Sequence, residues 1–161
     1  MTNELIELVF EVVPKEQLND LVNDLFPVSN VLQIISNDES LEFARDAKFD
    51  YVDAIKKTEL LTTAIIVKAS LVFFDGVSID NPLCQVLVYE DLVDVLIIFS
   101  LSDVRAEDGS DPLKVIHGAA SKIAEKSSVS DYYCGLEPAQ DERTRFFSKN
   151  MTGPLASPWS L

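Results

Sequence analysis

Apolar and polar side chains alternate through residues 5–13, which is the pattern of a strand that buries one face. The apolar face is formed by Ile6, Leu8, Phe10 and Val12. After Pro14 the apolar spacing changes to i, i+3, i+4, i+7, as on one side of a helix. The residues on that side are Leu18, Leu21, Val22 and Leu25. The pattern predicts a helix over 14–26 that begins at Pro14 and is ended by Pro27.

Strand-like and helix-like patterns mix in the residues that follow, up to position 73. A run rich in β-branched residues at 31–35 predicts a second strand. The apolar runs between 41 and 72 fit either kind of element, because short runs do not separate helix from strand. From the local residue types we expect a strand near 41–45, a short helix near 51–61 and a strand near 64–73.

Two turn signals and two apolar runs come next. An Asp-Gly pair at 75–76 and an Asn-Pro pair at 81–82 predict turns. The runs 84–89 and 92–101 predict two strands, and the second run is almost entirely apolar. A strand covered on both sides needs no polar face, so we expect 92–101 to be central and covered on both sides.

The last third of the chain combines a helix with a turn-rich segment. An Asp-Pro pair at 111–112 supplies an N-cap and a first-turn proline, and predicts a helix over 111–126. In residues 132–148, pairs of Tyr and Phe flank a middle that contains Gly and Pro, so we expect strand, ordered loop, strand. An irregular tail is expected from about residue 149.

The order of these elements predicts an α+β fold with a mostly antiparallel sheet and two main helices, about 14–26 and 111–126, packed on one face. Each of the two helices has a single apolar stripe, as a helix that covers one sheet face should. The length of 161 residues fits a single domain, 1–161. No apolar run is long enough to span a bilayer and the first residues are not basic, so we expect a cytoplasmic protein that does not enter a membrane.

The chain carries a net charge of −14, and this charge is unevenly distributed. Residues 1–111 hold 22 acidic and 7 basic side chains, a balance of −15, whereas residues 112–161 have a balance of +1. Such a polyanion repels nucleic acid. It attracts basic proteins and speeds their association. An alternative interpretation is that the charge serves solubility alone.

A partner-binding face should use carboxylates in or beside the loops between strands, where binding residues are commonly presented. The candidates are Asp75, Glu90, Asp91, Asp94, Asp103, Glu107 and Asp108. We expect their partner to be a basic protein. A second possibility is a homo-oligomeric scaffold that self-associates through an edge strand or through the tail that contains Trp159.

Signatures of catalysis and of metal binding are weak. Cys84 and Cys134 have no neighbours at metal-ligand spacing, and we expect both thiols to be reduced and buried. The acidic loop at 103–111 lacks the spacing of a calcium loop, and the glycines form no phosphate-binding motif. We therefore expect no cofactor and no metal. A small enzyme that uses His117, the single histidine, or a pair of carboxylates remains an alternative.

Residues 132–148 include Gly-Leu-Glu-Pro-Ala followed by Asp-Glu-x-Thr-x-Phe-Phe. With this stretch in one acidic α+β domain, the chain resembles small bacterial immunity proteins of polymorphic or contact-dependent toxin systems. The resemblance implies a cytoplasmic protein without enzymatic activity that binds and neutralises a cognate toxin domain, often a basic nuclease. The loop 137–145 has two interpretations: its arginines pair with its acids and pin it, or it joins the partner-binding face.

Overall fold

The computed structural model describes residues 4–39, 41, 49–57, 62–74, 76–90, 92–107, 109, 111–149 and 151–155. Its helices are α1 (Lys15–Leu25), α2 (Tyr51–Lys57) and α3 (Pro112–Lys126). Its strands are β1 (Leu5–Glu11), β2 (Val31–Ser36), β3 (Thr62–Ala69), β4 (Leu71–Phe74), β5 (Val77–Asp80), β6 (Leu83–Tyr89), β7 (Leu92–Ser100), β8 (Val104–Ala106), β9 (Asp131–Leu136), β10 (Arg145–Ser148) and β11 (Met151–Thr152). Short 3-10 turns span Val28–Asn30, Leu101–Asp103 and Glu142–Thr144.

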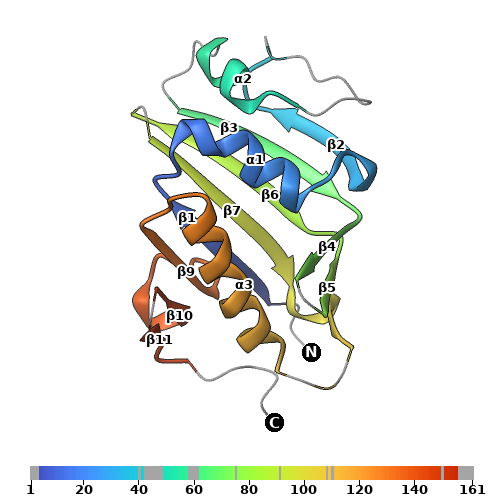
Figure 1. Cartoon of the computed structure of the whole chain (residues 1–161), viewed down its shortest axis with the longest axis vertical. Coiled ribbons are helices and arrows are strands. Elements are labelled where there is room, and N and C mark those ends of the chain that lie inside the picture. The colour runs from blue at the N-terminus through green and yellow to red at the C-terminus, as the bar shows by residue number, and fades with distance from the viewer. Residues whose placement is uncertain are drawn as a thin grey trace.

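Eight of the strands form one antiparallel sheet in the order β11-β10-β9-β1-β7-β6-β3-β2. Helices α1 and α3 lie across one face of this sheet, and α2 lies beside α1 (Figure 1). A smaller sheet, β4-β5-β8, stands near the C-terminal end of β7, and α3 contacts all three of its strands. The predicted α+β class, with a mostly antiparallel sheet and its two main helices on one face, is confirmed.

Strand β1 lies between β7 and β9. It therefore joins the β9–β11 part of the sheet to the part formed by β7, β6, β3 and β2. Three residues of the predicted apolar face, Ile6, Leu8 and Phe10, are buried in the main core under the helices. The fourth, Val12, was expected on the same face, but it lies beyond the end of the strand and is exposed. Leu8 is in register with Ile97 of β7 on one side and with Cys134 of β9 on the other. The core therefore closes around residues that are far apart in the sequence.

Both main helices form where their stripes and caps predict them. In α1 the buried residues are Leu18, Leu21 and Val22. Pro14 has an extended backbone (ψ 132°) and serves as the N-cap, so the helix begins one residue later than expected. In α3 the N-cap is Asp111, whose carboxylate accepts a hydrogen bond from the Leu113 amide at 3.0 Å. This bond satisfies one of the free N–H groups at the helix start.

The strand expected over 64–73 is in fact two strands in two sheets. Strand β3 belongs to the large sheet, and β4 belongs to the small one. The chain changes direction at Ser70, whose amide donates to the Asn30 carbonyl and whose carbonyl accepts from the Asn81 amide. The buried positions change from odd numbers in β3 to even numbers in β4. Because residues 71–74 are all apolar, the sequence carries no mark of this change. The loop expected near 103–110 likewise contains β8, which pairs with β5.

Strand β7 is central, as predicted, but it is covered on one face only. Val93, Val95, Ile97 and Phe99 are buried in the core. Leu96 and Ile98, on the other face, are only partly buried. The expectation that both faces would be covered is wrong, because an apolar side chain can also occupy the uncovered face of a sheet.

Some expectations fall outside the described residues. The strand near 41–45 lies there almost entirely, and so do positions 58–61 of the short helix, whose described part is α2. Where an irregular tail was expected from about 149, β11 pairs with β10. No helix among the described residues is long and apolar enough to cross a membrane.

Gly135 in β9 is required by a close approach of the backbone. A Cβ atom at this position would lie 2.5 Å from the Thr144 carbonyl oxygen and 2.8 Å from the Arg145 Cα atom. The strand β10 could not then pair with β9 at its present separation. Gly118, on the exposed side of α3, has no atom within 4 Å of an added Cβ, so it serves as a matched control.

We predict that Gly135→Ala lowers the free energy of unfolding by about 1–3 kcal/mol, because the added methyl group overlaps with backbone. Gly118→Ala should instead raise it by about 0.5–1 kcal/mol, because alanine suits a helix interior better than glycine. Urea denaturation followed by circular dichroism measures both. Equal stability of the two variants would show that β10 is not held at this distance.

Candidate functional site

The face of the large sheet opposite the helices, called the open face below, carries the side chains that alternate with the core residues. Its apolar members include Val9, Leu83, Leu87, Leu96, Ile98, Ile66 and Ile35. Val9 and Tyr133 form a small cluster here with Ala139, separate from the main core. The open face is thus partly apolar, as surfaces that contact a partner often are.

The loop 137–144 folds over the β9–β1 half of the open face. Ala139 is fully buried, and its amide donates to the Glu7 carboxylate at 3.1 Å. The guanidinium of Arg145 lies 3.9 Å from the centre of the Tyr133 ring and donates to the Ala139 carbonyl at 3.0 Å. Residues from β1, β9 and β10 therefore hold the loop in one position.

The interpretation of this loop as a pinned structural element is supported by specific contacts. Arg143 pairs with the exposed Asp141 at 3.3 Å, and this pair lowers the pKa of Asp141. Arg145 forms no such pair among the described contacts and binds backbone carbonyls instead. Burial raises the pKa of Glu7, although the hydrogen bond from the Ala139 amide partly opposes that effect. The buried Glu7 contact matters more than the exposed pair, because solvent screens exposed pairs.

A cluster of carboxylates and phenols lies at the end of the open face formed by the β6–β7 turn. One oxygen of Asp94 accepts from the Val12 amide at 2.9 Å, and the other accepts from the Tyr89 hydroxyl at 2.8 Å. The hydrogen bond to Asp94, with burial, raises the pKa of Tyr89 to about 12. Burial, together with the charge of Glu11, raises the pKa of Tyr133.

Asp94 and Glu90 were both candidates for partner binding, and the structure gives them different roles. Asp94 is 9% exposed, and both of its oxygens bind other parts of the chain. It also holds Val12 at a φ of 51°, a conformation that β-branched residues rarely adopt. Glu90, in the turn itself, is exposed. Sequence reasoning missed Glu11 and Tyr133, which join the cluster only because β1 and β9 are neighbours.

We predict that Asp94→Ala lowers the free energy of unfolding by about 1.5–3 kcal/mol, because the Val12 amide and the Tyr89 hydroxyl lose a charged acceptor. Glu90→Ala, four residues earlier in the β6–β7 turn, should change stability by less than about 0.5 kcal/mol. Chemical denaturation of both variants tests this difference. A neutral Asp94→Ala variant would remove the structural role assigned to this carboxylate.

The remaining described candidates lie at the opposite end of β7. Asp103 is half-buried in the 3-10 turn after β7, and Glu107 is exposed after β8. The Glu107 amide donates to the Gly76 carbonyl at 3.1 Å, which ties this loop to the β4–β5 turn. Nine strand residues separate this end from Glu90, a distance of about 30 Å. The candidates therefore form two groups, and Asp75, Asp91 and Asp108 lie outside the described residues.

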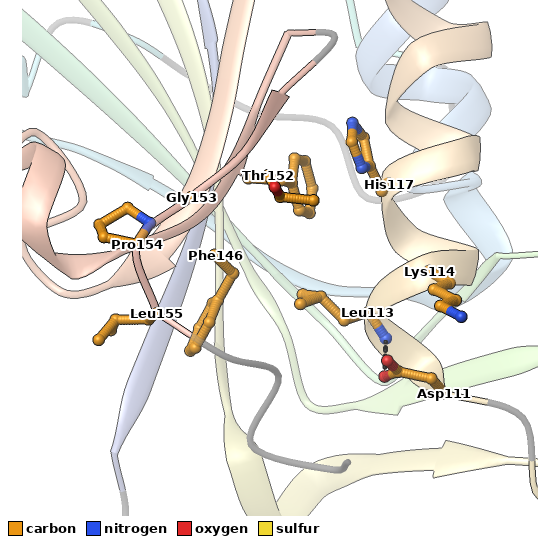
Figure 2. Close-up of a pocket in the computed structure, with 10 residues that line it drawn as sticks. Asp111, Leu113, Lys114, His117, Phe146, Thr152, Gly153, Pro154 and Leu155 are labelled. Carbon is orange, nitrogen blue, oxygen red and sulfur yellow. Dashed lines mark hydrogen bonds between the residues drawn. The ribbon is translucent and has the colours of Figure 1, made fainter.

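A cleft of about 350 Å³ opens between α3 and the β10–β11 hairpin (Figure 2). Its lining comprises Asp111, Leu113, Lys114, His117, Phe146, Phe147, Thr152, Gly153, Pro154 and Leu155. The His117 ring stacks on the Phe147 ring with 4.1 Å between centroids and 9° between planes. Most of the lining is apolar, and the imidazole takes part in it as a flat packing surface.

The cleft contains little that a catalytic histidine would need. Among the lining residues the one carboxylate, Asp111, caps α3, and the one hydroxyl belongs to Thr152. Burial raises the pKa of both Cys84 and Cys134, which keeps their thiols protonated and unreactive. In the described part of the chain no three His, Cys, Asp or Glu side chains gather to hold a metal ion.

We predict a specific pH effect at His117. Burial lowers its pKa, so below its unfolded value of about 6.5 the unfolded chain takes up the proton more readily than the folded chain. Wild type should therefore lose stability between about pH 7 and about pH 5. His117→Phe preserves a ring against Phe147 and should lose less over that interval. Thermal melts of both proteins at each pH give the comparison, and parallel losses would contradict it.

The fold defines a class of α+β domain in which helices cover one face of an antiparallel sheet, while the other face and the loop carboxylates remain available to a protein partner. A family model described as PABL017 Cdi1I immunity protein matches residues 4–152, so the chain belongs to this family of immunity proteins. The resemblance that residues 132–148 suggested is thereby confirmed.

A solved structure supports the same assignment. The chain is similar to one in the crystal structure of the toxic C-terminal tip of CdiA from Pseudomonas aeruginosa in complex with immune protein. The two chains are 25% identical with a TM-score of 0.80, and the match covers 96% of this chain and 100% of the other. No functionally curated protein matches this sequence.

Proposed function

We propose that this protein binds a cognate bacterial toxin domain of the CdiA C-terminal kind and neutralises it in the cytoplasm without catalysing a reaction. The observation that supports this most directly is the family match over residues 4–152. The structural neighbour adds to it, since that crystal structure is of a toxic CdiA tip in complex with immune protein. Neutralisation by binding needs a complementary surface and no chemistry of its own.

The partner surface is positively charged, and a nuclease is the toxin activity that fits best. The balance of −15 over residues 1–111 attracts a basic protein at long range. Nucleases bind a polyanion and therefore present positive charge at their active sites. An acidic protein that competes for that site associates with the nuclease faster. It also discriminates against partners that lack the positive charge.

The proposed partner-binding residues divide between the two ends of β7. Glu90 presents charge at one end, where Asp94 fixes the turn. Asp103 and Glu107 present charge at the other end. Asp75, Asp91 and Asp108, the other proposed residues, lie outside the described part of the chain. Asp103 and Glu107, the described members of the second group, flank the three-residue strand β8, so they can meet one partner surface together.

The competing class is an enzyme that acts through His117. The cleft beside this residue is the observation in its favour. Against it stand the stacking of the imidazole on Phe147 and the use of Asp111 as a helix cap. Membership of an immunity-protein family also favours a binding role.

The test is co-expression of this protein with the toxin domain encoded beside it. Wild type should restore bacterial growth and bind the toxin in a pull-down. Glu107→Lys should weaken binding by about threefold to tenfold and reduce its salt dependence, because a charge reversal at a contact rim removes attraction. Glu125→Lys makes the same change of charge on the exposed side of α3 and should leave binding unchanged within about twofold.

Two further arms separate the alternatives. His117→Phe should neutralise the toxin as well as wild type does, whereas loss of neutralisation with intact binding would favour the enzyme. If wild type fails to bind the toxin and to restore growth, the proposed function is wrong. If it binds but Glu107→Lys and Glu125→Lys behave alike, the loop at 103–108 is not part of the contact.

A further inference from the structure

Strand β2 is the last strand of the large sheet at one edge. Within the part of the chain that the structure describes, β2 pairs with β3 and with no second strand (Figure 1). An edge strand directs the N–H and C=O groups of alternate residues away from the sheet, where another strand can bind them. At six residues, β2 is the longest of the edge strands, since β4 has four, β8 three and β11 two.

The edge lacks the charged side chains and prolines that protect many edge strands. Residues 28–37 contain no charged side chain, although a quarter of the whole chain is charged. Leu32 is 62% exposed and Ile35 is 37% exposed. A bulge between Val31 and Gln33 interrupts the pairing near its start, but the register with β3 is regular from Gln33 to Ser36. Native edges are normally blunted by lysine, proline or charge, so an apolar and uncharged edge indicates a surface meant for pairing.

We propose that an extended segment of the cognate toxin adds to the large sheet as a further strand along β2. This inference rests on the proposed function and names the place of contact. Backbone hydrogen bonds along the edge would supply affinity, and side chains at alternate positions of the added strand would pack on Leu32 and Ile35. The same arrangement would remove both exposed apolar side chains from water.

The charge of the molecule selects the toxin over a second copy of this chain. Two copies would each bring a net charge of −14 to the contact and would repel each other. A basic toxin is attracted by that same charge. Because β2 itself is uncharged, the added strand would bury no ionised group of this protein, and so no desolvation of charge opposes the pairing.

The variant that tests the pairing is Leu32→Glu with Ile35→Glu. Both side chains are exposed, so the fold should be kept, which a thermal melt checks. Added negative charge would strengthen attraction to a basic toxin if general electrostatics governed binding. If a strand pairs with this edge, the buried carboxylates should instead weaken binding at least about tenfold. The control is Met151→Glu, 64% exposed on the opposite edge strand, which should bind within about twofold of wild type.

A second measurement reports on the backbone amides of β2. Hydrogen–deuterium exchange of residues 31–36 should slow when the toxin domain is added to wild type, because outward amides become hydrogen-bonded. Binding that leaves this exchange unchanged and tolerates the double variant would overturn the inference while the proposed function stands. A wild-type protein that light scattering shows to be a dimer, and that the double variant makes monomeric, would also overturn it in favour of self-pairing. Failure of wild type to bind would remove both proposals.

Discussion

The structure depends on the pairing of β1 with two strands that come from distant parts of the chain, β7 and β9. Because side chains alternate along a strand, this double pairing decides at once which residues enter the core and which lie on the open face. A shift of one residue would place Glu7 and Glu11 under the helices and Leu8 in solvent. Burial of two carboxylates in an apolar core is unfavourable enough to exclude the alternative register.

The two faces of the sheet have consequently different chemistry. The covered face is an apolar core shared with α1, α2 and α3. The open face combines apolar side chains with two buried acids, Glu7 and Asp94, and each of the two has a structural task. Glu7 binds the loop over β9, and Asp94 binds the turn before α1 and the β6–β7 turn. The described carboxylates that we propose as partner contacts, Glu90, Asp103 and Glu107, lie instead toward the ends of β7, where solvent still reaches them.

An immunity protein must bind its own toxin more tightly than other proteins. In the binding mode that we propose, two separate features contribute to that specificity. Charge at the loops acts over distance and favours basic partners in general. The uncharged β2 edge, in the pairing that we propose, would act only at contact, through backbone groups and shape. A steering surface and a pairing surface on different parts of one rigid sheet can change independently of each other.

The sequence by itself determined the elements with a strong period or a definite cap: the strand at 5–13, both main helices, and the strand–loop–strand segment at 132–148. It also determined the excess of negative charge. Only the tertiary structure decided the neighbours of each strand, the break at Ser70 and the roles of individual acids. The reason is that periodicity records whether a residue is buried but not against what. Asp94 and Glu90 look alike in the sequence, yet Asp94 is a structural residue because its partner, the Val12 amide, lies 82 positions away.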